Sequence, residues 1–320
     1  MTLHEIVQAI MKDRKGVLAV DENTAAIEKR FSNFDITCTE DTRRAYRELL
    51  FATEGIEGFL STILLSEEGI KQSTEGGIVF SDFLAAKNIF IALHLEVRES
   101  DDIPTRIQEY KSLAVVAVKR RLIEQVENNF GSGEFRARAD GLAEFARTVQ
   151  SIGLVPIVGF ELEQASTHSS LQAEDALTSG LSILTDSLEK AGVDFRGLII
   201  ETSMAGAGSE NPAPAEAGEV AERTVRALSV SLKEITGGVL FFSDGETAAV
   251  ATAELNAIAR LEPFPWPVAF CFSRALQDPV LAVWQGKEEN KAEAQAALYG
   301  RLSLDVAADV AGYSAGMELR

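Results

Sequence analysis

Eight short apolar runs alternate with longer helix-like segments, and this alternation limits what the chain can fold into more than any other feature. The runs cover residues 17–21, 59–65, 88–95, 113–118, 154–160, 195–201, 238–243 and 266–272. Between them, apolar residues recur with the period of an amphipathic helix in segments 39–51, 139–153, 170–192, 217–232, 246–261 and 287–310. About eight strand–helix units in 320 residues predict an α/β protein with a single (β/α)8 TIM barrel over residues 1–320.

The main alternative is an open, doubly wound sheet, which is also built from strands and helices in turn. No GxGxxG motif follows the first apolar run, as it would in a dinucleotide-binding sheet. No linker rich in Pro and Gly divides the chain, and the low-complexity stretch 205–218 follows the sixth run, where we expect a loop. These observations favour the barrel.

The charge of the chain narrows the choice of partners. A formal net charge of −19 repels nucleic acid and anionic membrane surfaces, so we expect neither as a partner. The same field repels phosphorylated ligands unless basic residues gather in a pocket. Cys38 and Cys271 are too few for a disulfide framework or a zinc motif. The first 16 residues form an amphipathic pattern containing Glu5, unlike a signal peptide, and we expect a cytoplasmic protein.

Charged and polar residues stand where the predicted strands end. In a barrel of this type, catalytic groups lie at the carboxyl ends of the strands. Reading those ends gives Asp21, His94 with Glu96, Lys119 with Arg121, Glu161, Glu201, Ser243 and Arg274. One such residue alone is usually solvated or paired; Asp21, for instance, could simply cap the next helix. Their convergence predicts a functional site for a small molecule.

Several stretches resemble the class I fructose-bisphosphate aldolases, in the order that this family has them. They are GVLAVDENTAAIEKRF, TRRAYRELLFATEGIEGFLSTILLSEE, GLVPIVGFE, FFSDGET, PWPVAFCFSRALQ and VWQGKEENKAEAQ. The resemblance implies a (β/α)8 barrel, often a homotetramer, and the glycolytic cleavage of fructose bisphosphate into two triose phosphates. In that reaction a lysine on the sixth strand forms a Schiff base, and the iminium acts as the electron sink. We expect no cofactor.

The resemblance assigns roles to matching positions. Asp21 matches the first-strand acid that orients substrate and assists proton transfer. Lys119 and Arg121 match the lysine and arginine of the fourth strand, and Glu161 matches the second acid of the fifth. The substrate-binding positions are His94, Arg121, Ser243, Asp244, Gly245, Ser273 and Arg274, the last five around a substrate phosphate.

The sequence departs from the family pattern at positions that carry the reaction or bind the phosphate. Glu201 stands where the Schiff-base lysine should be, and a carboxylate cannot form an iminium. Gly159 replaces the first acid of the fifth strand, and His94 replaces a lysine. Asp244 replaces a glycine of the phosphate loop and puts a negative charge there, while Ser273 weakens a further phosphate contact.

Two hypotheses follow. The first is a pseudoenzyme that binds a small anionic or sugar-like ligand at the barrel mouth. The alternative is an aldolase- or transaldolase-type lyase with its Schiff base on Lys119 and with Asp21 and Glu161 as acid and base. An ion pair between Lys119 and Glu201 would oppose the alternative, because it favours the charged amine, and we favour that pairing. Whether the chain is an enzyme is left open at this point.

Carboxylates at four strand ends could also be considered as oxygen ligands for magnesium or calcium. They are Asp21, Glu96, Glu161 and Glu201. We expect no metal, because Lys119, Arg121 and Arg274 crowd the same mouth.

Overall fold

Eight parallel strands close into a barrel in the computed structural model, which describes residues 1–96, 102–243 and 247–319. The strand order follows the sequence, and β1 pairs with both β2 and β8. The strands are β1 (Gly16–Val20), β2 (Leu60–Leu65), β3 (Phe90–His94), β4 (Val115–Glu124), β5 (Val155–Leu162), β6 (Ile199–Ser203), β7 (Gly238–Phe242) and β8 (Val268–Phe272). The predicted (β/α)8 barrel is therefore confirmed.

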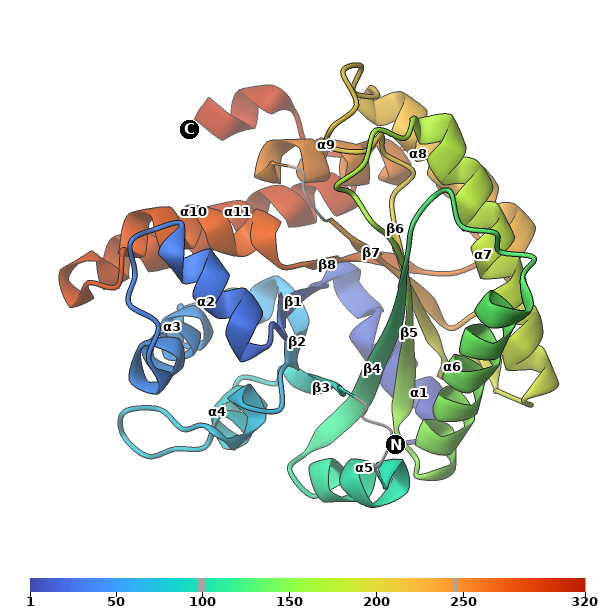
Figure 1. Ribbon diagram of the computed structural model, residues 1–320. Coiled ribbons are helices and arrows are strands. Elements are labelled where there is room, and N and C mark those ends of the chain that lie inside the picture. Colours follow the sequence, from blue (N-terminus) through green and yellow to red (C-terminus); the bar gives the residue numbers. More distant parts are fainter. Residues whose placement is uncertain (97–101, 244–246, 320) are drawn as a thin grey trace.

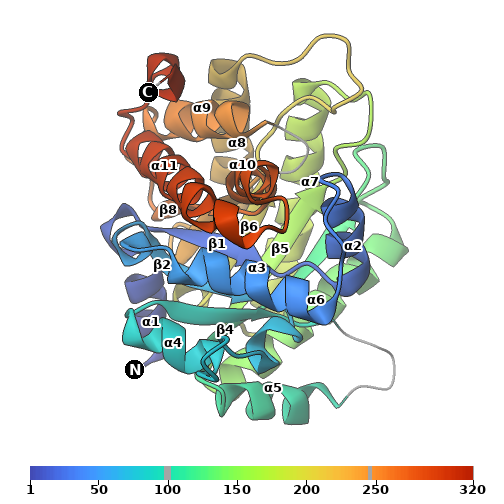
Figure 2. The ribbon, with the colours of Figure 1, turned by 90° about the vertical axis from the view of Figure 1, so that its left-hand side faces the viewer.

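Helices surround the strands, as Figure 1 shows. They are α1 (Leu3–Ile10), α2 (Thr24–Ser32), α3 (Glu40–Ala52), α4 (Phe80–Ala86), α5 (Ile103–Lys111), α6 (Gly133–Ser151), α7 (Ser170–Lys190), α8 (Ala217–Ser231), α9 (Ala248–Ala259), α10 (Arg274–Trp284) and α11 (Lys291–Asp309). Among the described residues, no helix has an apolar stretch long enough to cross a membrane. The view turned by 90° in Figure 2 shows α3 in front of β1, with α10 and α11 beside β8.

Helices α4, α5 and α10 were not among the predicted segments, and two of the predicted strands differ most from the expected bounds. Strand β4 runs on to Glu124, beyond the predicted end at residue 118, because it pairs with β5 as far as Glu124 and Leu162. The charged residues after Val118 hid this continuation from a search for apolar runs. The segment Phe195–Gly197 was predicted to be the start of a strand but is a 3-10 helix.

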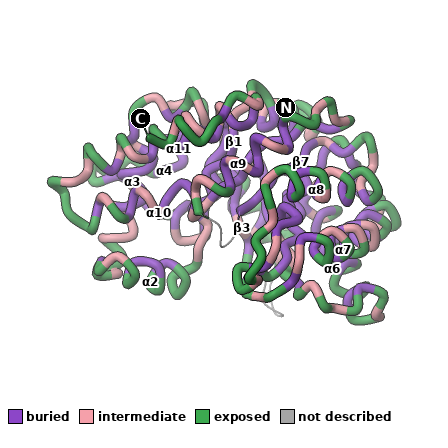
Figure 3. Tube along the Cα trace, turned by 90° about the horizontal axis from the view of Figure 1, so that it is seen from above, coloured by how far each residue is buried: buried purple, intermediate pink, exposed green. Residues whose placement is uncertain are grey.

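Two hydrophobic clusters divide the core, and they follow from the two-residue period of the strands. In β1, Leu18 and Val20 pack outward against the helices, whereas Val17 and Ala19 lie inside the barrel. Helix α1 contributes Ile6, Val7 and Ile10 to the inner cluster. The tube in Figure 3 shows buried segments inside and exposed segments on the helical rim. The two-residue period directs the next residue, Asp21, into the barrel.

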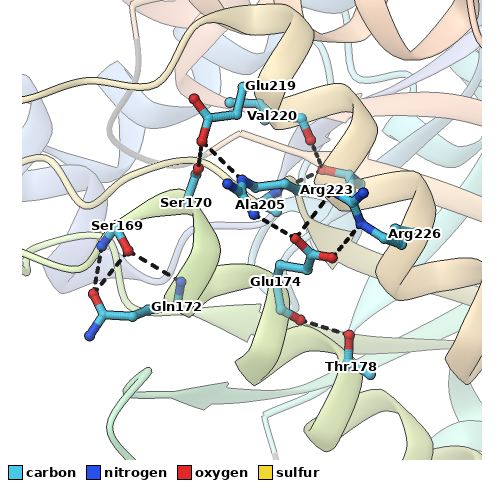
Figure 4. A network of polar contacts seen from close by, with 11 residues as sticks. Ser169, Ser170, Gln172, Glu174, Thr178, Ala205, Glu219, Val220, Arg223 and Arg226 are labelled. Carbon is cyan, nitrogen blue, oxygen red and sulfur yellow. Dashed lines mark hydrogen bonds and ion pairs between the residues drawn. The ribbon is translucent and has the colours of Figure 1, made fainter.

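Helices α7 and α8 are joined by a network of charged side chains (Figure 4). The carboxylate of Glu174 accepts hydrogen bonds from Arg223 Nη1 at 2.8 Å and from Arg226 Nε at 2.6 Å. Arg223 Nε also donates to Glu219, which accepts from the Ser170 hydroxyl at 2.7 Å. This network fixes α8 against α7 and with it the path of the loop that follows β6.

Candidate active site

A cavity of about 450 Å³ opens at the carboxyl ends of the strands. Its inner part is lined by Asp21, His94, Lys119, Arg121 and Glu201, and its outer part by residues of α2 and α10. Asp21, His94, Lys119 and Glu201 occupy inward positions, because each lies two places after a residue of the inner cluster, and Arg121 follows Lys119 with the same spacing. For example, Ala117 precedes Lys119, and Ile199 precedes Glu201.

Strand register brings these residues together. His94 pairs with Lys119 between β3 and β4, while Arg121, Gly159 and Glu201 lie side by side across β4, β5 and β6. A methyl group built on Gly159 would lie 2.6 Å from Arg121 Cβ and 3.3 Å from Glu201 Oε2. The absence of a side chain at Gly159 therefore leaves room for Arg121 and Glu201 to face each other.

Lys119 is the centre of the site. Its side chain is 2% exposed, and its ammonium group forms an ion pair with Glu201 Oε2. Two further carboxylate oxygens lie near Nζ, Glu161 Oε1 at 3.5 Å and Asp21 Oδ2 at 3.8 Å. Burial acts to lower the pKa of Lys119, but the attraction of Glu201, Glu161 and Asp21 outweighs it and raises that pKa above its usual range. The amine is held in its charged form.

Asp21 is held as an anion. His94 Nδ1 lies 2.9 Å from Asp21 Oδ2. Burial acts to raise the pKa of Asp21, but the charges of Lys119 and the contact with His94 outweigh it, so the pKa is far below its usual value. Asp21 does not cap helix α2, because Asn23 Oδ1 accepts the hydrogen bond from the backbone N–H of Ala26 at 3.0 Å.

The fifth strand contributes Glu161, whose neighbours push its pKa in opposite directions. Arg121 Nη1 donates a hydrogen bond to Glu161 Oε2 at 2.7 Å. The pKa of Glu161 is nevertheless raised, because burial and the nearby charge of Glu201 outweigh Lys119 and Arg121.

Below Lys119 and Glu201, burial raises the pKa of the Cys271 thiol well above its usual range, so this thiol is not a thiolate nucleophile.

The expected phosphate-binding residues lie farther out. Ser243, Ser273 and Arg274 line the outer cavity, and Ser273 Oγ accepts a hydrogen bond from Gln277 Nε2 at 3.1 Å. The predicted positions Asp244 and Gly245 lie outside the described residues. His94 contacts Asp21 at the end of the first strand, while Glu96 accepts a hydrogen bond from Asn23 Nδ2 at 3.0 Å.

Sequence reasoning missed an ion-pair bridge at the rim. Arg30 of α2 forms ion pairs with Glu22 and with Asp278, the latter at 2.8 Å from Nε. The bridge joins the last turn of α2 to Glu22, which precedes this helix, and to α10 beside the cavity, which Lys29 also lines. The only signal in the sequence is the basic pair near the end of the segment AAIEKRF.

The described part of the chain contains no set of side chains suited to bind a metal ion. No group of three or more His, Cys, Asp or Glu side chains in residues 1–96, 102–243 and 247–319 could hold one. Asp21, Glu161 and Glu201, which we considered as ligands, lie around the Lys119 ammonium instead.

The fold and this mouth define a closed (β/α)8 barrel with charged side chains gathered at the carboxyl ends of its strands. The family model described as "Glycolytic: Fructose-bisphosphate aldolase class-I" matches residues 2–319. The chain therefore belongs to the class I fructose-bisphosphate aldolase family.

Named relatives cover nearly the whole chain. A probable fructose-bisphosphate aldolase class 1 of Xylella fastidiosa is 34% identical over 93% of this chain and 94% of its own length. Fructose-bisphosphate aldolase 3, chloroplastic, of Arabidopsis thaliana is 32% identical over 98% of this chain and 83% of its own. A co-crystal structure of fructose-bisphosphate aldolase from Plasmodium falciparum with TRAP and an inhibitor superposes with a TM-score of 0.91. It is 31% identical and covers 98% of this chain and 95% of its own.

Proposed function

We propose that this barrel binds a small anionic, sugar-like ligand at its mouth and does not carry out the Schiff-base cleavage of its family. The observation that carries the proposal is the buried ion pair between Lys119 and Glu201. Glu201 occupies the place on the sixth strand where the family resemblance expects the reactive lysine, and Glu201 has no amine.

Lys119 does not replace that lysine. Attack on a carbonyl carbon requires a neutral amine with a free electron pair, and enzymes obtain one by lowering the pKa of the lysine. Here Glu201, Glu161 and Asp21 raise the pKa of Lys119, which makes the neutral amine rare at pH 7. The alternative is a lyase with its Schiff base on Lys119 and with Asp21 and Glu161 as acid and base. For that reaction Lys119 lies in a suitable position, but its amine is in the wrong charge state.

The outer cavity suits an anionic group, although the whole chain is acidic. Three cations, Lys29, Arg30 and Arg274, line it together with the carboxylates of Glu22, Glu96 and Asp278, and Arg30 forms ion pairs with Glu22 and Asp278. The inner cavity offers carboxylate oxygens, which accept hydrogen bonds from hydroxyl groups. A polyhydroxylated molecule with one anionic end satisfies both parts. The proposal includes a cytoplasmic location and a homotetramer, both taken from the expectations raised by the sequence.

The test combines binding and turnover. Isothermal titration calorimetry with glucose 6-phosphate and fructose 1,6-bisphosphate is expected to show binding, and a coupled assay is expected to show no triose phosphate release. Arg274→Met should weaken binding about tenfold or more, because a hydrogen bond to a charged group is lost. Arg147→Met is the control, since Arg147 lies on α6 and pairs with exposed Glu144.

Two results would contradict the proposal. One is steady cleavage of fructose 1,6-bisphosphate by the purified protein. The other is the absence of binding heat and of any change in the melting temperature with both sugar phosphates. That result would contradict the proposed binding of a ligand.

A further inference from the structure

Two side chains in the inner part of the cavity are the most open to a ligand. The side chain of His94 is 14% exposed and that of Arg121 is 31% exposed, and both line the cavity. Lys119 and Glu201 are almost fully buried and pair with each other. A bound molecule therefore meets the imidazole and the guanidinium group rather than the buried ion pair.

The imidazole of His94 is held beside an anion. Nδ1 lies 2.9 Å from Asp21 Oδ2, and the charge of Lys119 helps to keep the pKa of Asp21 far below its usual value. A carboxylate in this place favours the tautomer with its proton on Nδ1, and it stabilises the imidazolium that forms when Nε2 takes a proton. Within the described residues, Nε2 has no hydrogen-bond partner. This arrangement is typical of a histidine that acts as a base.

The guanidinium group of Arg121 supplies the matching positive charge. Its Nη1 donates to Glu161 Oε2 at 2.7 Å, and its other N–H groups make no hydrogen bond with a described residue. A fixed guanidinium that keeps free donors can stabilise negative charge developing on a substrate oxygen. The cavity thus places a base and an oxyanion-stabilising group at one end.

We infer that His94 acts as the base in an aldose–ketose isomerisation of the bound sugar, with Asp21 as the residue that positions it. This inference rests on the proposed function, from which it takes the sugar-like ligand, and adds a reaction to it. The reaction needs no neutral amine, so the ion pair of Lys119 with Glu201 does not oppose it.

The reaction moves two protons within one molecule. Nε2 of His94 takes the proton from C2 of the open-chain aldose, the C–H electron pair forms the C1=C2 bond, and the carbonyl electrons pass to O1 beside Arg121. The proton of the O2 hydroxyl then moves to O1. The imidazolium returns its proton to C1 while the C2=O bond forms, which gives the ketose. No oxidant or second substrate is required.

The test uses fructose 6-phosphate and the purified full chain in deuterium oxide. Nuclear magnetic resonance is expected to show deuterium at C1 and the formation of glucose 6-phosphate. His94→Gln should slow the exchange about a hundredfold or more, because the base is lost. The Kd from calorimetry should change by less than about threefold, since binding and proton transfer are separate steps. His94→Asn serves if circular dichroism shows that His94→Gln is unfolded.

Two further measurements separate a base from a side chain that only supports the fold. In His94→Gly, added imidazole should restore part of the exchange, because the free base can enter the space left by the side chain. Asp21→Asn should lower kcat about tenfold or more and leave KM within about threefold, since the amide no longer stabilises the imidazolium.

The control variant is His4→Gln. His4 is exposed on α1 and lies near Gly237 and Pro267, which directly precede β7 and β8 at the opposite end of the barrel. This variant should keep the full rate of exchange. An isomerase carried over from the expression host would act equally in all variants.

The outcomes separate the two proposals. Binding of fructose 6-phosphate without exchange, or exchange that survives the substitution of His94, overturns the isomerisation and leaves the binding of a sugar phosphate intact. Absence of both binding and exchange with fructose 6-phosphate and glucose 6-phosphate overturns both.

Discussion

Lys119→Met is expected to lower the free energy of unfolding by about 3–5 kcal/mol, because it leaves buried carboxylates without their shared cation. Glu201 is fully buried, and Glu161 and Asp21 are nearly so. Methionine keeps most of the volume of lysine, so the loss comes from charge rather than from a cavity. Urea unfolding at pH 7, followed by circular dichroism, measures the change.

The controls separate the buried charge from the loss of any lysine. Lys12→Met removes an amine whose side chain is 70% exposed and should change stability by less than about 1 kcal/mol. The double variant Lys119→Met/Glu201→Gln should recover part of the loss, because one unpaired carboxylate goes with the amine. If Lys119→Met lowers the free energy of unfolding by less than about 1 kcal/mol, the ion pair contributes little to the stability of the protein.

Glu201→Lys, which installs the lysine that the family resemblance expects, should also destabilise the protein by about 3 kcal/mol or more. It places a second ammonium group beside Lys119 and removes the carboxylate that pairs with it. Like charges in a buried site repel, and the pKa of at least one amine must fall to relieve this. Thermal and urea unfolding of the variant report the loss.

A double variant that moves the amine from position 119 to position 201 is the matched test. Lys119→Met/Glu201→Lys keeps one amine among Asp21 and Glu161 and should be more stable than Glu201→Lys alone. Glu163→Lys, at an exposed position, should unfold like the unchanged protein. Stability of Glu201→Lys within about 1 kcal/mol of the original would show that the mouth tolerates either charge.

Most of the barrel could be predicted from the sequence, because buried parallel strands are continuous apolar runs. The clearest miss was the end of β4, where the strand continues through KRRLIE. Lys119 and Arg121 face the mouth, Arg120 and Glu124 face α6, and only pairing with β5 identifies these charged residues as strand. Helix α10 was not among the predicted segments, and Pro279 inside it obscures the helical pattern.

The inner site could be predicted because strand ends and a two-residue period fix which side chains point inward. The opposite charges of Lys119 and Glu201, on strands two apart, favoured their pairing. The bridge of Arg30 to Asp278 could not be predicted, since it depends on how α2 and α10 pack. The same holds for Gly159, where the lost acid makes room for Arg121 and Glu201.

The most direct measurement is reductive trapping of a Schiff base. The protein is incubated with dihydroxyacetone phosphate or fructose 1,6-bisphosphate, reduced with borohydride and mapped by mass spectrometry. A relative with a lysine at the sixth-strand position serves as the positive control. We predict no adduct on Lys119 with either compound. A stoichiometric adduct on Lys119 would contradict the conclusion that Glu201 holds this amine in its charged, unreactive form.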